Sequence, residues 1–166
     1  MKDDLTKSDI EKMKAEIEER KVVIRPKLLE DLKEARAQGD LSENFEYYAA
    51  KKAKNKNESR IRYLERMIKT ANIIDDTRIS GEVGINNRVT VEFTEDGTTE
   101  SYKIVTTVRS NSLEGLISID SPMGKALLKR KTGDVVTVNV SDDISYDVKI
   151  VSIDDEDDAD DRIRSF

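Results

Sequence analysis

The chain has 166 residues, of which 39% are charged and 5% aromatic, and it contains no His, Cys or Trp. That length suits one ordinary domain or two small ones, and the composition is typical of a long helical element with a modest core. The lack of Cys excludes disulfides, thiolate catalysis and zinc-thiolate sites, and the lack of His removes the commonest general base and metal ligand.

The net charge of −6 is unevenly distributed. Residues 1–75 are slightly basic, whereas the remainder is strongly acidic. With a pI near 4.9, autonomous binding to duplex nucleic acid is not expected. The start of the chain does not resemble a signal peptide, and no apolar run approaches about 18 residues. We therefore expect a soluble cytoplasmic protein without a membrane segment.

Residues 6–37 are predicted to form a helix that begins at an N-cap provided by Thr6 or Ser8. Pro26 lacks a backbone N–H, so a kink or restart is expected around residues 22–26. Apolar side chains recur at steps of three, four and seven along one face. This stripe consists of Ile10, Met13, Ile17, Ile24, Leu28, Leu32 and Ala35.

Residues 43–74 predict a second helix with the seam of a coiled coil. The seam is formed by Ala50, Lys54, Asn57, Ile61, Leu64, Ile68 and Ala71. Two long helices joined by a short turn fold back as an antiparallel hairpin. Because the seam is apolar toward the base and polar toward the tip, we expect the outer half to be the less stable one.

Beyond residue 76 the period changes to alternation, and a compact α+β module is expected over residues 77–153. Its predicted strands cover residues 88–93, 102–105, 116–119, 135–140 and 145–153, and one helix is predicted over residues 122–129. The chain thus divides into a helical hairpin (1–76), the α+β module and an acidic tail (154–166). The tail is expected to be disordered because its acids repel one another.

Residues 39–44, between the two helical patterns, carry more than a turn requires. They place two carboxylates, Asp40 and Glu43, at the far end of the hairpin. On spacing alone, the pair is close to a capping box for the second helix, and Ser42 is an alternative cap. The other interpretation is functional, because a narrow rod with an acidic tip can deliver negative charge where a globular domain cannot enter.

Two segments at this separation resemble a known family. Residues 39–51 on a helical hairpin are similar to the tip of bacterial Gre transcript-cleavage (transcription elongation) factors, and most of all to the GreA branch. Residues 117–128, followed by 133–136, resemble the FKBP-like C-terminal domain of the same family. The resemblance spans nearly the whole chain. Phe45 and Tyr48 differ from the residues usual in the family, which fits either a main member or a divergent paralogue.

The resemblance implies a hairpin that enters the secondary channel of bacterial RNA polymerase and stimulates cleavage of the backtracked RNA 3′ end. Asp40 and Glu43 would be the catalytic carboxylates and would share a Mg²⁺ with the polymerase, in complex only. The chain would have no cofactor of its own and would not be an enzyme. It would meet DNA only indirectly, through the polymerase, and act as a monomer.

The expected tip contacts with RNA combine cations, polar groups and an aromatic ring. They are Leu41, Ser42, Asn44, Tyr47, Arg36, Lys51 and Lys52. For the lysines, a solvated helix face is an equally good interpretation, and for at least one tyrosine packing below the turn is the more common role. Polymerase docking by the C-terminal domain is expected at Asp120, Ser121, Pro122, Met123 and Gly124.

Three other functions remain open from the sequence. A Gre-like regulator could bind polymerase and occupy the channel without stimulating cleavage, but it would be expected to alter the acidic tip. A prolyl isomerase needs an aromatic-lined apolar pocket, for which residues 79–166 hold few aromatics. A purely structural coiled coil would keep its seam apolar to the end.

Overall fold

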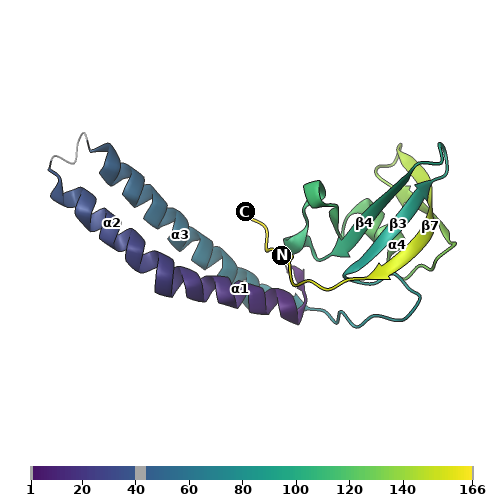
Figure 1. Cartoon of the computed structure of the whole chain (residues 1–166), viewed down its shortest axis with the longest axis horizontal. Helices are drawn as coiled ribbons and strands as arrows, with labels where there is room; N and C mark the ends of the chain where they lie inside the picture. The colour runs from purple at the N-terminus through teal and green to yellow at the C-terminus, as the bar shows by residue number, and fades with distance from the viewer. Residues whose placement is uncertain (1, 40–43, 166) are drawn as a thin grey trace. The chain divides into compact units, whose positions relative to one another are not determined.

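The computed structural model describes residues 2–39 and 44–165. Their contacts divide the chain into two compact units: residues 10–71 belong to the first, whereas residues 4–9 and those from 72 onward form the second. The first unit is a pair of long helices, and the second is a mixed sheet with a short helix (Figure 1). The predicted α+β fold, with a helix pair followed by a sheet domain, is confirmed.

The first helical arm consists of α1 (Lys7–Glu19), the π-helix η1 (Arg20–Ile24) and α2 (Arg25–Ala37). Thr6 is the N-cap of α1, because its Oγ1 accepts a hydrogen bond from the Asp9 amide at 3.1 Å. The Asp9 carboxylate in turn accepts from the Thr6 amide at 3.0 Å, which completes a capping box. Of the two caps that the sequence offers, Thr6 is the one used.

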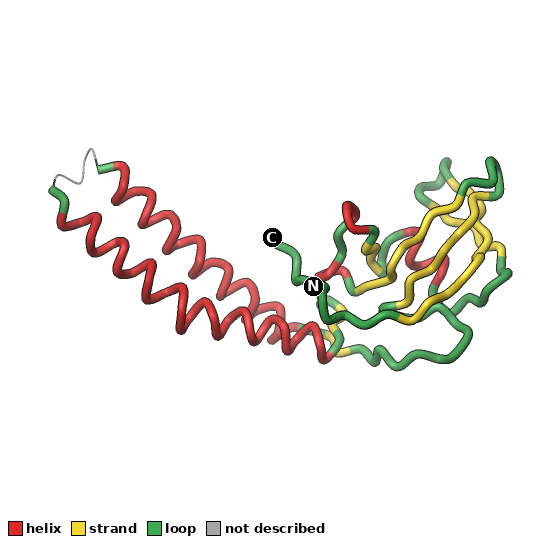
Figure 2. Tube along the Cα trace, viewed as in Figure 1, coloured by secondary structure: helices red, strands yellow, loops and turns green. Residues whose placement is uncertain are grey.

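The interruption predicted near Pro26 takes the form of a π-helical turn. Pro26 has no N–H for the helical ladder, and its ring crowds the carbonyl one turn earlier. The Arg25 amide donates to the Arg20 carbonyl, which is the five-residue spacing of a π-helix. The arm therefore absorbs the proline without breaking, and Figure 2 shows one continuous helical tube from α1 through α2.

The second arm is a single helix, α3 (Phe45–Thr70). It ends before the predicted end at residue 74, because Ala71 is already extended. The residues that follow form β2 (Asn72–Ile73), which pairs in parallel with β1 (Asp4–Leu5) in the second unit. The helical assignment of residues 71–74 was wrong because this backbone belongs to a sheet ladder.

The two arms pack along the predicted seam. Ile61 and Leu64 are buried as expected, but Met67 is more buried than the seam residue Ile68. The polar seam residue Asn57 is only 2% exposed. The buried apolar residues of the facing arm are Met13, Leu32 and Ala35. The hairpin core thus mixes aliphatic packing with a buried amide.

The second unit is built on a five-stranded sheet in the order β5-β4-β3-β7-β6. Within this five-stranded sheet, β4 and β5 pair in parallel and the other neighbouring strands pair antiparallel. Gly97, in the left-handed region, lies in the predicted turn between β3 and β4. The bounds are β3 (Asn87–Phe93), β4 (Thr99–Val105), β5 (Leu116–Ser118), β6 (Val135–Asn139) and β7 (Ser145–Asp155), with 3₁₀ turns η3 (Thr107–Arg109) and η4 (Ser112–Glu114) and helix α4 (Pro122–Leu127). Alternate strand residues and α4 close one apolar core.

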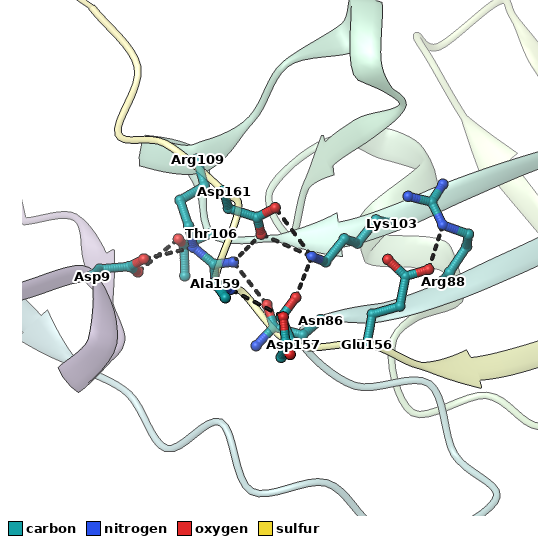
Figure 3. A network of polar contacts seen from close by, with 10 residues as sticks. All are labelled: Asp9, Asn86, Arg88, Lys103, Thr106, Arg109, Glu156, Asp157, Ala159 and Asp161. Atoms are coloured by element: carbon teal, nitrogen blue, oxygen red, sulfur yellow. Dashed lines mark hydrogen bonds and ion pairs between the residues drawn. The ribbon is translucent and has the colours of Figure 1, made fainter. Parts of the chain in front are cut away.

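The acidic tail makes defined contacts, which differs from the expected disorder. Strand β7 already extends to Asp155. The Asp161 carboxylate is only 8% exposed and contacts both Lys103 and Arg109 (Figure 3). The Arg164 amide donates to the Val108 carbonyl at 2.7 Å. The expected disorder rested on repulsion between the acidic side chains of the tail. Two buried cations of the sheet domain, Lys103 and Arg109, compensate this repulsion.

Candidate functional site at the hairpin tip

The predicted carboxylate pair, Asp40 and Glu43, lies outside the described residues, as do Leu41 and Ser42. The functional assignment of these four residues stays a prediction. The structure does define both edges of the tip. On the first edge, Gly39 has a φ of 115°, a left-handed conformation that glycine adopts without a Cβ penalty.

On the second edge, Asn44 is the N-cap of α3. Its Oδ1 accepts from the Tyr47 amide at 2.9 Å, while its Nδ2 donates to the Ala35 carbonyl at 2.7 Å. One side chain therefore caps α3 and also binds a carbonyl in the last turn of α2. This corrects the sequence interpretation, in which Asp40 or Ser42 capped the helix. Sequence reasoning had considered Asn44 only as an RNA contact.

Aromatic and cationic side chains pack just below the tip. The Arg36 guanidinium carbon lies 5.7 Å from the centroid of the Tyr47 ring, within cation–π range. The rings of Tyr47 and Tyr48 meet edge to face with centroids 5.5 Å apart. Tyr47 is half-buried in this cluster, whereas Tyr48 is 51% exposed. The structure thus brings Arg36 and Tyr47 together from the two arms.

A shallow groove of about 450 Å³ runs along α3 below this cluster. It contains the predicted residues Lys51 and Lys52, both exposed, together with a third exposed lysine, Lys56. Its complete lining is Tyr48, Lys51, Lys52, Asn55, Lys56 and Ser59. Three cations beside an exposed aromatic ring form a surface that can attract a phosphate backbone and stack a base.

A polar network across the seam holds the two arms in register. Arg60 donates to Glu16 through Nε at 2.8 Å and Nη2 at 3.2 Å. Arg20 bonds Glu16 at 2.8 Å and the Asn57 side chain at 2.9 Å. Sequence reasoning placed Asn57 in the seam but missed the three charged residues, because charges on a helix are usually solvated.

The electrostatics of this network are visible at Glu16. Burial alone would raise the pKa of its carboxyl group, but hydrogen bonds from Arg60 and Arg20 outweigh this effect. The pKa of Glu16 is therefore lowered from 4.5. Such directional contacts specify one register of the arms, as single polar seam residues do in coiled coils.

The predicted docking segment of the second unit divides into exposed and structural residues. Asp120 and Pro122 are exposed. Ser121 caps α4 by accepting from the Gly124 amide at 3.0 Å. Met123 and Gly124 are buried, and a methyl group on Gly124 would collide with the Ser118 carbonyl. Only Asp120 and Pro122, and in part Ser121, present a surface to a partner.

The described residues hold no site for a metal ion of their own. Among residues 2–39 and 44–165, no three acidic, His or Cys side chains are grouped so that they could bind a cation. Within the same ranges, no helix combines the length and the apolarity needed to cross a membrane.

The fold and the site define a class of protein with a helical hairpin followed along the chain by a mixed-sheet α+β domain. Residues 4–73 match the family model described as "Transcription elongation factor, N-terminal". Residues 78–155 match "Transcription elongation factor, GreA/GreB, C-term". The chain belongs to the Gre family of transcription elongation factors, as its sequence motifs predicted.

Two GreA proteins agree with this assignment. The chain is 42% identical to transcription elongation factor GreA of Lactococcus lactis subsp. cremoris (strain MG1363), over 90% of this chain and 96% of that protein. It is also 42% identical to GreA of Brucella anthropi, over 81% and 87% of the two chains. Among solved structures, GreA factor homolog 1 (Gfh1) of Thermus thermophilus is 29% identical, with a TM-score of 0.43 over 92% of this chain and 99% of that one.

Proposed function

We propose that this elongation factor inserts its hairpin into the secondary channel of bacterial RNA polymerase and stimulates cleavage of backtracked RNA 3′ ends. In this way it rescues arrested complexes in the bacterial cytoplasm. The observation that carries the proposal is the family membership of both units, together with the acidic tip residues Asp40 and Glu43 in the family's order.

The hairpin has suitable dimensions for this task. Helix α3 contains 26 residues, which corresponds to about 39 Å at roughly 1.5 Å per residue. Two packed helices form a rod only two helix diameters wide. A rod of this kind can enter a channel that excludes the sheet domain.

The proposed chemistry belongs to the polymerase, and the factor supplies two carboxylates. Carboxylate oxygens are the ligands that Mg²⁺ prefers, so Asp40 and Glu43 would hold a Mg²⁺ shared with the polymerase site. When bound there, this ion supplies charge neutralisation at the phosphate and activation of the attacking water. One of the two carboxylates would bind the Mg²⁺, and the other would orient or deprotonate the attacking water. Because Asn44 caps α3, helix initiation does not require Asp40.

The described residues next to the tip refine the proposed RNA contacts. Both ends of the Asn44 amide are engaged within the hairpin, so we assign it to positioning the tip. Tyr47 packs under Arg36, which favours the exposed ring of Tyr48 for stacking on a base. Lys51 and Lys52 would attract the extruded RNA, with Leu41 and Ser42 touching it at the tip.

The remaining parts of the proposal concern the partner and the state of the factor. Asp120 and Pro122, exposed at the start of α4, would contact the polymerase surface. The factor would act as a monomer, because one channel admits one hairpin. Alone it would not hydrolyse RNA, since an exposed acidic tip has no water-excluding pocket in which to stabilise a transition state.

The test is transcript cleavage by a stalled, backtracked polymerase. The parent protein is compared with Asp40→Ala and Glu43→Ala, and with Asp31→Ala as a control that removes an exposed carboxylate from α2. Each tip variant is expected to lower the stimulated rate roughly 30- to 1000-fold, the usual effect of losing one transition-state contact. The control should cleave like the parent.

Polymerase binding and helix content are measured on the same variants. Tip variants that bind like the parent and keep its helix content but fail to stimulate cleavage would support the proposed role. Tip variants that cleave like the parent would remove Asp40 and Glu43 from the mechanism. A parent protein that binds polymerase without stimulating cleavage would instead identify a regulator that only occupies the channel.

A further inference from the structure

The sheet of the second unit carries a row of cations that is unfavourable by itself. Arg88 of β3 and Lys103 of β4 are direct partners across the antiparallel strand pair, so their side chains lie on the same face. Like charges in directly opposite positions destabilise a strand pair. Arg109 of η3 extends the row. The Lys103 and Arg109 side chains are 5% and 0% exposed, and buried cations require anionic partners.

Residues 156–165, which we call the strap, supply these partners. The Glu156 carboxylate accepts from Arg88 Nε at 2.6 Å. Farther along, the Asp161 carboxylate lies 3.0 Å from Lys103 Nζ. The family model's match ends at residue 155, so the strap lies beyond the part of the chain that the model describes.

Arg109 joins the strap to a second segment of the unit. Its Nη1 donates to Asp161 at 2.8 Å, while its Nε donates to Asp9 at 2.6 Å (Figure 3). Nη1 also bonds the Asn86 side chain at 2.8 Å. Among the described residues, Nη2 of Arg109 has no hydrogen-bond partner. The guanidinium is therefore held by one carboxylate from each end of the chain.

The second segment, Asp4–Asp9, depends on the same carboxylate for its local structure. Asp9 accepts from the Thr6 amide at 3.0 Å and from the Thr106 hydroxyl at 2.7 Å. Leu5 is fully buried, and its carbonyl accepts from the Ile74 amide at 2.9 Å. A change in the position of Arg109 would therefore act directly on Asp9, the carboxylate that accepts from the Thr6 amide in the capping box of this segment.

We propose that the strap is a latch that controls how firmly the Asp4–Asp9 segment is held, through the Arg109 guanidinium that both share. When Asp161 leaves, Lys103 loses its carboxylate, and Arg109 keeps the Asp9 carboxylate and the Asn86 side chain, so the guanidinium is no longer held by carboxylates from two sides. Coupling between two sites through one group is reciprocal. Loosening the Asp4–Asp9 segment must therefore loosen the strap by the same factor.

The test is hydrogen exchange of backbone amides in the full chain. The strap is monitored at Arg164, whose amide bonds the Val108 carbonyl, and the N-terminal segment is monitored at the Ile74 amide. Asp161→Asn is expected to accelerate exchange at both places on the order of tenfold, because it removes the negative charge that strengthens the hydrogen bonds from Lys103 and Arg109. Amides in the ladder between β3 and β7 should remain as slow as in the parent.

Asp160→Asn is the matched control. It removes the same charge from the neighbouring position, whose side chain is exposed and does not form the ion pairs with Lys103 and Arg109 that hold Asp161. The control is expected to exchange like the parent. Equal exchange in Asp160→Asn and Asp161→Asn would show that the strap is not held by Asp161. Acceleration confined to Arg164 would show a strap that is not coupled to the Asp4–Asp9 segment.

The reverse substitution keeps the test decisive if Asp161→Asn unfolds the domain. Asp9→Asn leaves the strap sequence intact but removes one of the two carboxylates from Arg109. Reciprocity requires faster exchange at Arg164 in this variant, again on the order of tenfold. A parent-like rate at Arg164 in Asp9→Asn overturns the proposal.

Discussion

Replacing Arg60 with Met tests whether the seam network stabilises the hairpin. Arg60 comes from the middle of α3, and its side chain is 8% exposed. It gives two hydrogen bonds to Glu16 on the facing arm, at 2.8 and 3.2 Å, and lies over the ring of Tyr63 at 5.4 Å. Met fills a similar volume but provides no donor and no charge.

The expected loss of unfolding free energy depends on the contacts that Glu16 keeps after Arg60 is replaced. A hydrogen bond to a charged group contributes about 1.5–3 kcal/mol. Glu16 keeps its bond to Arg20 at 2.8 Å, and its side chain is 24% exposed, so water replaces part of the loss. We expect the free energy of unfolding to fall by about 2 kcal/mol. Arg25→Met is the control, because its ion pair with Glu58 is roughly one-third exposed and should cost about 0.5 kcal/mol.

The assay is urea unfolding followed by far-ultraviolet circular dichroism, whose signal comes mostly from the long helices. A double-mutant cycle with Glu16→Gln separates the pair energy from the loss of packing. If Arg60→Met and Arg25→Met lose the same stability, or the cycle gives no coupling energy, the network does not stabilise the hairpin. The register of the arms would then have to come from aliphatic packing alone.

Two further substitutions test the electrostatics and the packing. Folding lowers the pKa of Glu16 below 4.5, so its stabilising contribution is complete above that pH and is lost as the pH falls through the lower folded value. The difference in unfolding free energy between the parent and Glu16→Gln should shrink over this range, and an unchanged difference would contradict the assignment. Gly124→Ala should cost about 1–3 kcal/mol in the second unit, because its Cβ would collide with the Ser118 carbonyl. Lys125→Ala, at an exposed neighbouring position, should stay within about 0.5 kcal/mol of the parent in the same urea-unfolding experiment.

Much of the fold could be predicted because it depends on local patterns. The apolar seam at Ile61 and Leu64, the cap at Thr6 and the effect of Pro26 each follow from spacing within a few turns of helix. The end of α3 could not be predicted in this way. Asn72 and Ile73 pair with residues at the start of the chain, and such distant pairing overrides a continuing helical pattern.

The residues that the sequence assigned wrongly or overlooked are those with partners far away in the chain. The tail contains many similar acids, and nothing local distinguishes Asp161 from its neighbours. Its selection depends on Lys103 and Arg109, which lie more than fifty positions earlier. Asn44 is an exception, because its capping bond to the Tyr47 amide is local and Asn is a preferred N-cap residue; only its second bond, to the Ala35 carbonyl, depends on the packing of α2 beside α3.

The polar seam has a consequence for how the proposed function would work. A tip that places a carboxylate against a reacting phosphate must be positioned to about half an ångström, which aliphatic packing along a sliding seam does not ensure. Arg60 and Arg20 anchor the arms through directional bonds, and Asn44 joins α2 to α3 at the edge of the tip. Each of these contacts fails if one arm slips by a residue. The polar contacts that stabilise the hairpin would therefore also hold the two edges of the tip, Gly39 and Asn44, in a single register, as the proposed function requires.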